Sequence, residues 1–244
     1  MKSISHCAIT FDGILLDAEL KDFMTINVEG RQLISKNLET KKIQGRDGDI
    51  VLNGQYPSRD ITVHFLIKDR NNFMFLEQIK KLTEILETQG EVEFSFADED
   101  GYRKGIVSNV NDPPHDSNVG VGSFTIHCQD PFLYRELRTT NNSIPRLQFK
   151  KYDVKIEEIK INIVPTQKIV IKNETRGTKI ILNDNFSDGI LIIKKDSITV
   201  NGQNKMMSLD FVESDYQNFK LFSGDNVSIS PEMNFEIKFR ERVL

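Results

Sequence analysis

One segment of the chain places a large apolar residue at every second position more clearly than any other: Ile61-Thr62-Val63-His64-Phe65-Leu66-Ile67-Lys68. Successive side chains of a β-strand point to opposite faces, so this spacing predicts a strand with one face in a core. Shorter alternating runs occur at residues 24–28, 92–96 and 124–128. The first half of the chain is therefore expected to be built around a half-buried β-sheet.

The composition supports a β-rich protein. The 244 residues include 28 Ile but only three Ala. β-branched residues pack well on pleated sheets, whereas Ala is the best helix former, so a helical bundle is excluded. The formal net charge of −4 gives no basic excess for an open nucleic-acid surface. No apolar run approaches the roughly 20 residues that span a bilayer, so no membrane association is expected.

A single helix is expected in the first half, over about residues 71–88. Its apolar residues recur at steps of four, three and four: Phe75, Ile79, Leu82 and Leu86. This spacing is typical of a helix that packs one stripe against a sheet. Leu76 is expected to widen the stripe, and Glu77 and Lys81 to pair on the outer face.

A polar stretch, residues 31–42, interrupts the strand pattern and is expected to form an exposed loop or arm. It leads to Gly45-Arg46-Asp47-Gly48, where Asp47 and Gly48 can supply the positive φ angles of a tight turn. After a linker-like segment, residues 139–145, the second half shows many short apolar runs separated by turn residues. This pattern predicts an antiparallel β-sandwich. The expected domains are 1–138 and 139–244.

The sequence shows no recognisable chemistry. It lacks the glycine-rich phosphate loops and the paired-histidine zinc motif. The histidines share no metal-ligand spacing: His6, His64, His115 and His127. We therefore expect no catalytic residues, no cofactor and no metal, and a protein that is not an enzyme.

The order of several short motifs carries more information than any one of them. Along the chain they are Gly45-Arg46-Asp47-Gly48, residues 57–63, the single helix, a strand leading to Asp130-Pro131, and an all-β tail with residues 188–192 and 221–226. In this order and spacing the chain resembles the distal tail protein family of long, flexible-tailed bacteriophages (siphoviruses).

The resemblance implies a mainly β fold. An N-terminal β-sandwich or split-barrel-like domain with one α-helix would form a ring, and a galectin-like antiparallel β-sandwich would follow it. Gly45, Arg46, Asp47 and Gly48 would lie in the ring-forming domain, and Asp130-Pro131 would end its last strand. These are structural positions in the family, not catalytic ones.

The resemblance also implies a function. The protein would be a virion component at the phage tail tip, synthesised in the host bacterial cytoplasm. A homohexameric ring would join the tail tube to the tape-measure and the tail-tip or receptor-binding proteins, while DNA passes through the lumen without being specifically bound. Independently, sheet edges must be covered, and closed cyclic symmetry can cover them with neighbouring copies.

Two other readings remain open from the residues. A carbohydrate-binding module of a virion or surface protein would attach to host-wall glycan through exposed Tyr or Phe side chains near Tyr216. A hydrolase with an unrecognised pair of carboxylates would cleave a wall polysaccharide. The missing motifs make the hydrolase the least favoured of the three, and the absence of Trp disfavours a sugar-binding site.

Overall fold

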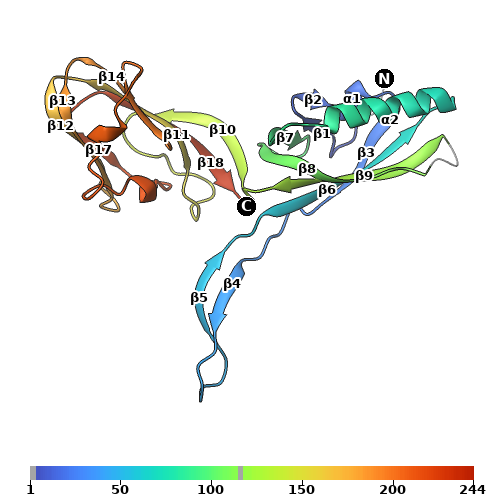
Figure 1. Ribbon diagram of the computed structural model, residues 1–244, viewed down its shortest axis with the longest axis horizontal. Coiled ribbons are helices and arrows are strands. Elements are labelled where there is room, and N and C mark those ends of the chain that lie inside the picture. Colours follow the sequence, from blue (N-terminus) through green and yellow to red (C-terminus); the bar gives the residue numbers. More distant parts are fainter. Residues whose placement is uncertain (1–3, 115–117) are drawn as a thin grey trace. The chain divides into compact units, whose positions relative to one another are not determined.

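A computed structural model describes residues 4–114 and 118–244, so His115 lies outside the described residues. The chain is mainly β and folds as two compact units, which divide between Leu133 and Tyr134 (Figure 1). Leu244 groups with the first unit. The predicted mainly β fold class is confirmed.

The first unit contains a seven-stranded antiparallel sheet with the strand order β2-β1-β7-β8-β9-β6-β3. The strands are β1 (Ile9–Phe11), β2 (Ile14–Leu15), β3 (Phe23–Glu29), β6 (Arg59–Lys68), β7 (Val92–Phe96), β8 (Arg103–Asn111) and β9 (Val119–Cys128). The segment with the clearest alternation lies in β6, between β9 and β3. Its residues at alternate positions from Ile61 to Ile67 are buried, as predicted.

Helix α2 (Asn72–Leu86) lies along one face of this sheet and buries Phe75, Leu82 and Leu86 in the core of the unit (Figure 1). It ends at Leu86 rather than at residue 88. Leu76 is 36% exposed, so the predicted widening of the stripe is wrong.

The predicted pair between Glu77 and Lys81 is also wrong. Glu77 accepts a hydrogen bond from Lys80, at 2.8 Å, and Lys81 bonds Glu19 of a short helix, α1 (Leu16–Glu19), at 2.5 Å. A helix of four residues is too short to show a periodic pattern, so the sequence predicted neither α1 nor this partner.

Three neighbouring phenylalanine rings lie in the first core. The ring of Phe65 lies 5.2 Å from that of Phe23 and 6.1 Å from that of Phe124, centroid to centroid. A Cβ atom at Gly122 of β9 would lie 2.5 Å from Cζ of Phe65. This close approach explains why a glycine occupies the interior of a strand.

The second unit is a sandwich of a six-stranded sheet, β10-β18-β11-β14-β15-β16, and a three-stranded sheet, β13-β12-β17. The strands are β10 (Leu133–Thr140), β11 (Lys155–Ile163), β12 (Thr166–Asn173), β13 (Lys179–Phe186), β14 (Gly189–Lys194), β15 (Ser197–Val200), β16 (Gln203–Asn204), β17 (Val227–Ser230) and β18 (Phe235–Val243). Two 3₁₀ turns, η1 (Met206–Ser208) and η2 (Tyr216–Asn218), complete the unit. Ile144, in the stretch that reads as a linker, is buried in its core.

Side chains alternate along the central strands of the larger sheet. On β11, Ile159, Ile161 and Ile163 are buried, whereas Lys160 is half-buried and Asn162 is exposed. Lys160 lies opposite Glu236 of β18 in the ladder. The outer face of this sheet is therefore polar, and its inner face forms the core.

Candidate assembly interface

A two-stranded hairpin, here called the arm, is formed by β4 (Asn37–Lys41) and β5 (Ile50–Gln55). Among the described strands it pairs with none outside itself, and in Figure 1 it lies apart from the seven-stranded sheet. The exposed fractions of Leu38, Val51 and Leu52 are 58%, 54% and 56%. An isolated hairpin is at best marginally stable in water, so this arm offers apolar surface to another molecule.

The predicted motif Gly45-Arg46-Asp47-Gly48 lies in the loop at the tip of the arm, and all four residues are exposed. Gly45 and Gly48 each have a φ of +81°. Asp47 does not have a positive φ, so the prediction that Asp47 and Gly48 supply the positive φ angles of a turn holds for Gly48 only. The connection between β4 and β5 is a longer loop, and each of its two bends uses a glycine because L side chains rarely adopt this φ.

An ion pair holds the base of the arm. The Arg31 guanidinium donates two hydrogen bonds to the Asp98 carboxylate, at 2.5 and 2.6 Å. Its centre lies 5.1 Å from the centroid of the Phe96 ring. The bonds from Arg31 hold the pKa of Asp98 below its usual range. This arrangement fixes the chain where it leaves β3 for the arm.

Two buried arginines reinforce that base. Arg59 donates a hydrogen bond to the Arg31 carbonyl oxygen at 2.5 Å, and Arg103 donates to the same oxygen at 3.3 Å. Arg103 also bonds the Glu99 carboxylate. Burial, with the nearby Arg103 charge, lowers the pKa of Arg59. Sequence analysis missed this cluster because its members come from distant segments and share no local pattern.

The edge strand β3 is a second open feature of the first unit. Among the described strands it pairs only with β6. Met24 and Ile26 are 38% and 42% exposed. The buried carboxylate of Asp17 accepts hydrogen bonds from the amide and the hydroxyl of Thr25, which satisfies one stretch of this edge. The remaining edge can pair with a strand of another chain.

A groove of about 430 Å³ opens between α2 and the strands beneath it. Its walls are mostly apolar and include Phe65, Leu82, Leu86 and Val110. Val110 is 48% exposed. The arm, the β3 edge and this groove thus each expose apolar side chains in the first unit.

Asp130 and Pro131 lie just beyond the end of β9, which is the last strand of the seven-stranded sheet along the chain. The Asp130 carboxylate accepts a hydrogen bond from the Phe132 amide at 3.1 Å, and Pro131 is buried. These two residues shape the exit from the first unit. They lie far from the arm tip in the sequence.

Two histidines of the first unit form local pairs. His127 bonds Asp60 at 2.6 Å across β9 and β6, and His64 lies 3.4 Å from Glu29. Within the described ranges, no three potential ligand side chains come together as a metal site would require. Neither α1 nor α2 has the length and the apolar run that a bilayer crossing requires.

Tyr216, near which the carbohydrate-binding hypothesis places its aromatic contacts, is half-buried and packs against the second core. Its ring packs against the buried residues, and its hydroxyl donates to the Lys194 carbonyl oxygen at 2.6 Å. Burial raises the pKa of this phenol. The Tyr216 ring is therefore engaged in the fold instead of standing free as a sugar platform.

Comparison with protein families matches both units. Residues 18–128 match the phage tail protein RIFT-related domain, and residues 153–242 match the siphovirus-type tail component, C-terminal domain. No curated protein is similar to the chain at a significant level.

Solved structures share the fold. The Dit protein of phage SPP1, described as a paradigm of the hub adsorption apparatus in phages that infect Gram-positive bacteria, superposes with a TM-score of 0.81. It is 18% identical, over 97% of this chain and 99% of that one. Chains of the phage p2 baseplate, in its activated conformation with strontium or calcium, superpose with TM-scores of 0.52 at 10% and 11% identity. Each alignment covers 91% of both chains.

Proposed function

The chain belongs to the family of siphovirus-type tail components, and we propose that it is a structural hub subunit of the phage tail tip. In this role it forms a ring that joins the tail tube to the host-recognition proteins of the tip. The protein is made in the host cytoplasm and resides in the virion. The role is structural and involves no catalysis.

The arm is the observation that carries this proposal. A free monomer would expose Leu38, Val51 and Leu52 on a hairpin with no core of its own. Such a hairpin gains stability when another protein covers its apolar side chains. The ion pair between Arg31 and Asp98 holds the chain at the base of the arm. A fixed base suits a subunit whose arm makes the same contact with each neighbouring copy.

Identical copies are the partners we propose for the arm and for the β3 edge. Closed cyclic symmetry satisfies every such edge with the same contact, and we propose a homohexamer because the resemblance to distal tail proteins implies one. DNA passes through the lumen of this ring without specific binding. The net charge of −4 is compatible with this passage, because a negatively charged protein does not attract the DNA phosphates. The two faces of the ring meet the tail tube and the tape-measure or receptor-binding proteins.

Light scattering on a sizing column, with negative-stain images, tests the proposal. The wild-type chain at tens of micromolar, alone or with its tube protein, should form rings. The double variant Leu38→Ser, Val51→Ser should shift the population toward monomer, because the arm loses the apolar surface that its neighbour covers.

The variant Val212→Ser is the matched control, because Val212 is 95% exposed but lies in the second unit. It should leave the rings unchanged. A wild-type chain that stays monomeric even beside its tube partner would refute the proposal. If the double arm variant forms rings to the same extent as the wild type, the proposed role of the arm is refuted.

A further inference from the structure

The groove between α2 and β8 combines an apolar lining with acidic residues. Leu82 and Leu86 of α2 are buried in its wall, and Val110 of β8 is 48% exposed there. Among the described residues that line it, the charged ones are Glu87 and Asp112, and both are exposed. An occupant with an apolar face and positive charge beside that face would therefore fit this groove.

The arm of the first unit has such an apolar face. Thr40 of β4 lies opposite Val51 of β5 in the ladder, and Leu38 lies two residues before Thr40 on the same strand. Opposite residues of a ladder share a face of the sheet, as do residues two apart on one strand. Leu38 and Val51, both more than half exposed, therefore lie on the same face of the hairpin.

Charge distinguishes the two sides of the arm. Residues 36–46, which span β4 and the first part of the tip loop, include four Lys or Arg and one acidic residue. The acidic residues of the tip, Asp47 and Asp49, come directly before β5. The β4 side of the arm is therefore basic, and its charge is opposite to that of Glu87 and Asp112 in the groove.

We propose that the apolar face of the arm of one copy lies in the groove between α2 and β8 of the neighbouring copy, with its β4 side toward Glu87 and Asp112. This placement rests on the hub role proposed above and names the surface that receives the arm. No residue of the arm lines the groove of its own chain. Seating the arm removes Leu38, Val51 and Val110 from water in one contact, which is favourable because all three are apolar.

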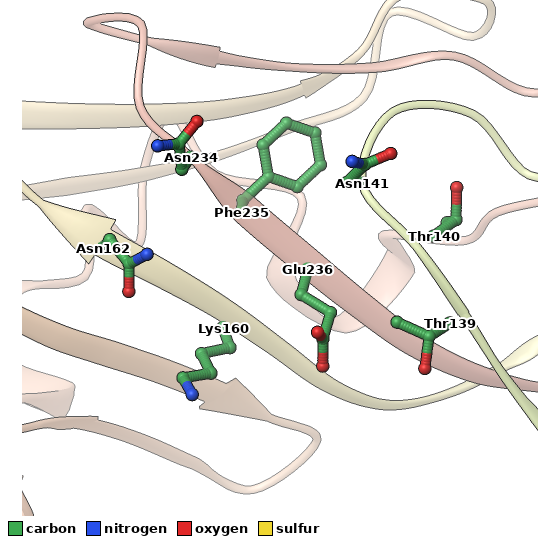
Figure 2. A pocket seen from close by; sticks show the side chains of 8 residues that line it. All are labelled: Thr139, Thr140, Asn141, Lys160, Asn162, Asn234, Phe235 and Glu236. Carbon is green, nitrogen blue, oxygen red and sulfur yellow. The ribbon is translucent and has the colours of Figure 1, made fainter.

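Two other surfaces of the chain suit this face of the arm less well. The β3 edge offers backbone groups, which pair with the edge of a strand and not with a face of side chains. A cavity of about 450 Å³ in the second unit is lined mostly by polar side chains, among them Lys160, Asn162 and Glu236 (Figure 2). An apolar face laid over that cavity would leave polar groups without partners, which costs free energy.

Cross-linking tests where the arm lies. The double variant Val51→Cys, Val110→Cys places one thiol on the apolar face of the arm and one in the groove. A short bismaleimide should join them between neighbouring copies, so the assembled protein should give a ladder of covalent oligomers on a denaturing gel. Peptide mass spectrometry should find residue 51 joined to residue 110. The two native cysteines are buried and should not contribute.

The matched control is Val51→Cys, Val121→Cys. Val121 is 54% exposed, close to the 48% of Val110, but it lies on the opposite face of the same sheet. Its neighbour Gly122 lies opposite Phe65 on the core face, so Val121 points away from the groove. The control should give about tenfold less covalent oligomer, because only thiols held together react at a raised effective concentration.

A charge reversal tests the acidic lining separately. The variant Glu87→Lys, Asp112→Lys should weaken the association of copies by about tenfold, because like charges then meet across the contact. Adding Lys41→Glu and Lys42→Glu to the same chain should restore most of that loss. Both groove residues are exposed, and a lysine suits the C-terminal end of α2, so the variant should fold.

The outcomes separate this proposal from the hub role. Rings that give no ladder with Val51→Cys, Val110→Cys, or an equal ladder with the control, would overturn the placement of the arm and leave the hub role standing. A charge reversal in the groove that the arm changes do not restore would also overturn it. A wild-type chain that forms no rings would refute both proposals.

Discussion

The contact between Arg31 and Asp98 makes the stability of the first unit depend on pH in a definite direction. The pKa of Asp98 is lowered from its ordinary value of 3.8, chiefly by the hydrogen bonds from Arg31. A lowered carboxyl pKa stabilises the folded state above the unfolded pKa, and this contribution is lost as the pH falls through the folded pKa. We expect Asp98→Asn to reduce the free energy of unfolding at pH 7 by about 1 kcal/mol.

The pH at which Asp98→Asn no longer changes the free energy of unfolding tests whether the ion pair is the cause. Urea titrations of the wild type and of Asp98→Asn should converge as the pH falls through the lowered pKa of Asp98, because the protonated carboxyl is then as neutral as the amide that replaces it. The exposed pair of Glu77 and Lys80 supplies the control, because Glu77→Gln should change little at any pH. An undiminished effect of Asp98→Asn at the lowest pH would show that the ion pair is not its cause.

Cys128 illustrates how burial governs reactivity at a single residue. Its thiol is fully buried in β9, and burial raises its pKa to about 12. The thiolate is the reactive form, so native Cys128 should resist a disulfide reagent at pH 8. In the variant Cys7→Ser, no thiol should react until denaturant is added, after which one should react.

The exposed thiol of an additional Asn218→Cys change in that variant should react at once, which confirms that the reagent is active. Immediate reaction of one thiol in the native Cys7→Ser protein would contradict the burial of Cys128. Both cysteines are buried, and neither is in a disulfide.

Among the elements, the arm shows what the sequence could predict and what it could not. The polar run 31–42 predicted exposure, and every residue of β4, which lies within that run, is exposed. The pairing of β4 with β5 was not predicted, because a hairpin without a buried face has no alternating pattern to detect. The cluster of Arg31, Arg59 and Asp98 at the base of the arm was not predicted for a different reason, since only the folded chain brings these residues together.

The arm should also be the first element that a protease cuts. Lys41, Lys42 and Arg46 are exposed trypsin sites at the end of β4 and in the tip loop, and no core packs behind them. Backbone with few buried contacts opens locally at low cost, so early tryptic fragments should end at these residues. Mass spectrometry of the first fragments identifies the cut sites.

The rate of this cleavage in the assembled protein shows whether a neighbouring subunit covers the arm. In the assembled protein, cleavage at Lys41, Lys42 and Arg46 should slow markedly. Cleavage at Lys194 and Lys195, between β14 and β15 of the sandwich, should keep its rate. Early cuts in the sandwich with an intact arm would contradict the open position of the arm.

For the molecule as a whole, the strong local patterns were sufficient for the fold class. β6 and α2 lie in the predicted places because each has one long apolar face, in β6 at every second residue and in α2 along a stripe. The cavity of about 450 Å³ in the second unit could not be predicted. Its lining combines the end of β10 and the start of β18 with the second half of β11, which only the strand order β10-β18-β11 brings together.

Two separate cores imply two separate unfolding events. Phe65 belongs to the first core and Ile161 to the second, and both are almost fully buried. Removing a buried phenylalanine ring costs about 3–5 kcal/mol, so Phe65→Ala should destabilise the first unit strongly. Ile161→Ala should destabilise the second by about 2–5 kcal/mol.

Hydrogen exchange resolved by peptide distinguishes the units, because each change should accelerate exchange in its own sheet only. Phe73→Ala, at a ring that is 67% exposed, is the control and should alter neither. Acceleration in both units from either core change would mean that the chain unfolds as one cooperative body.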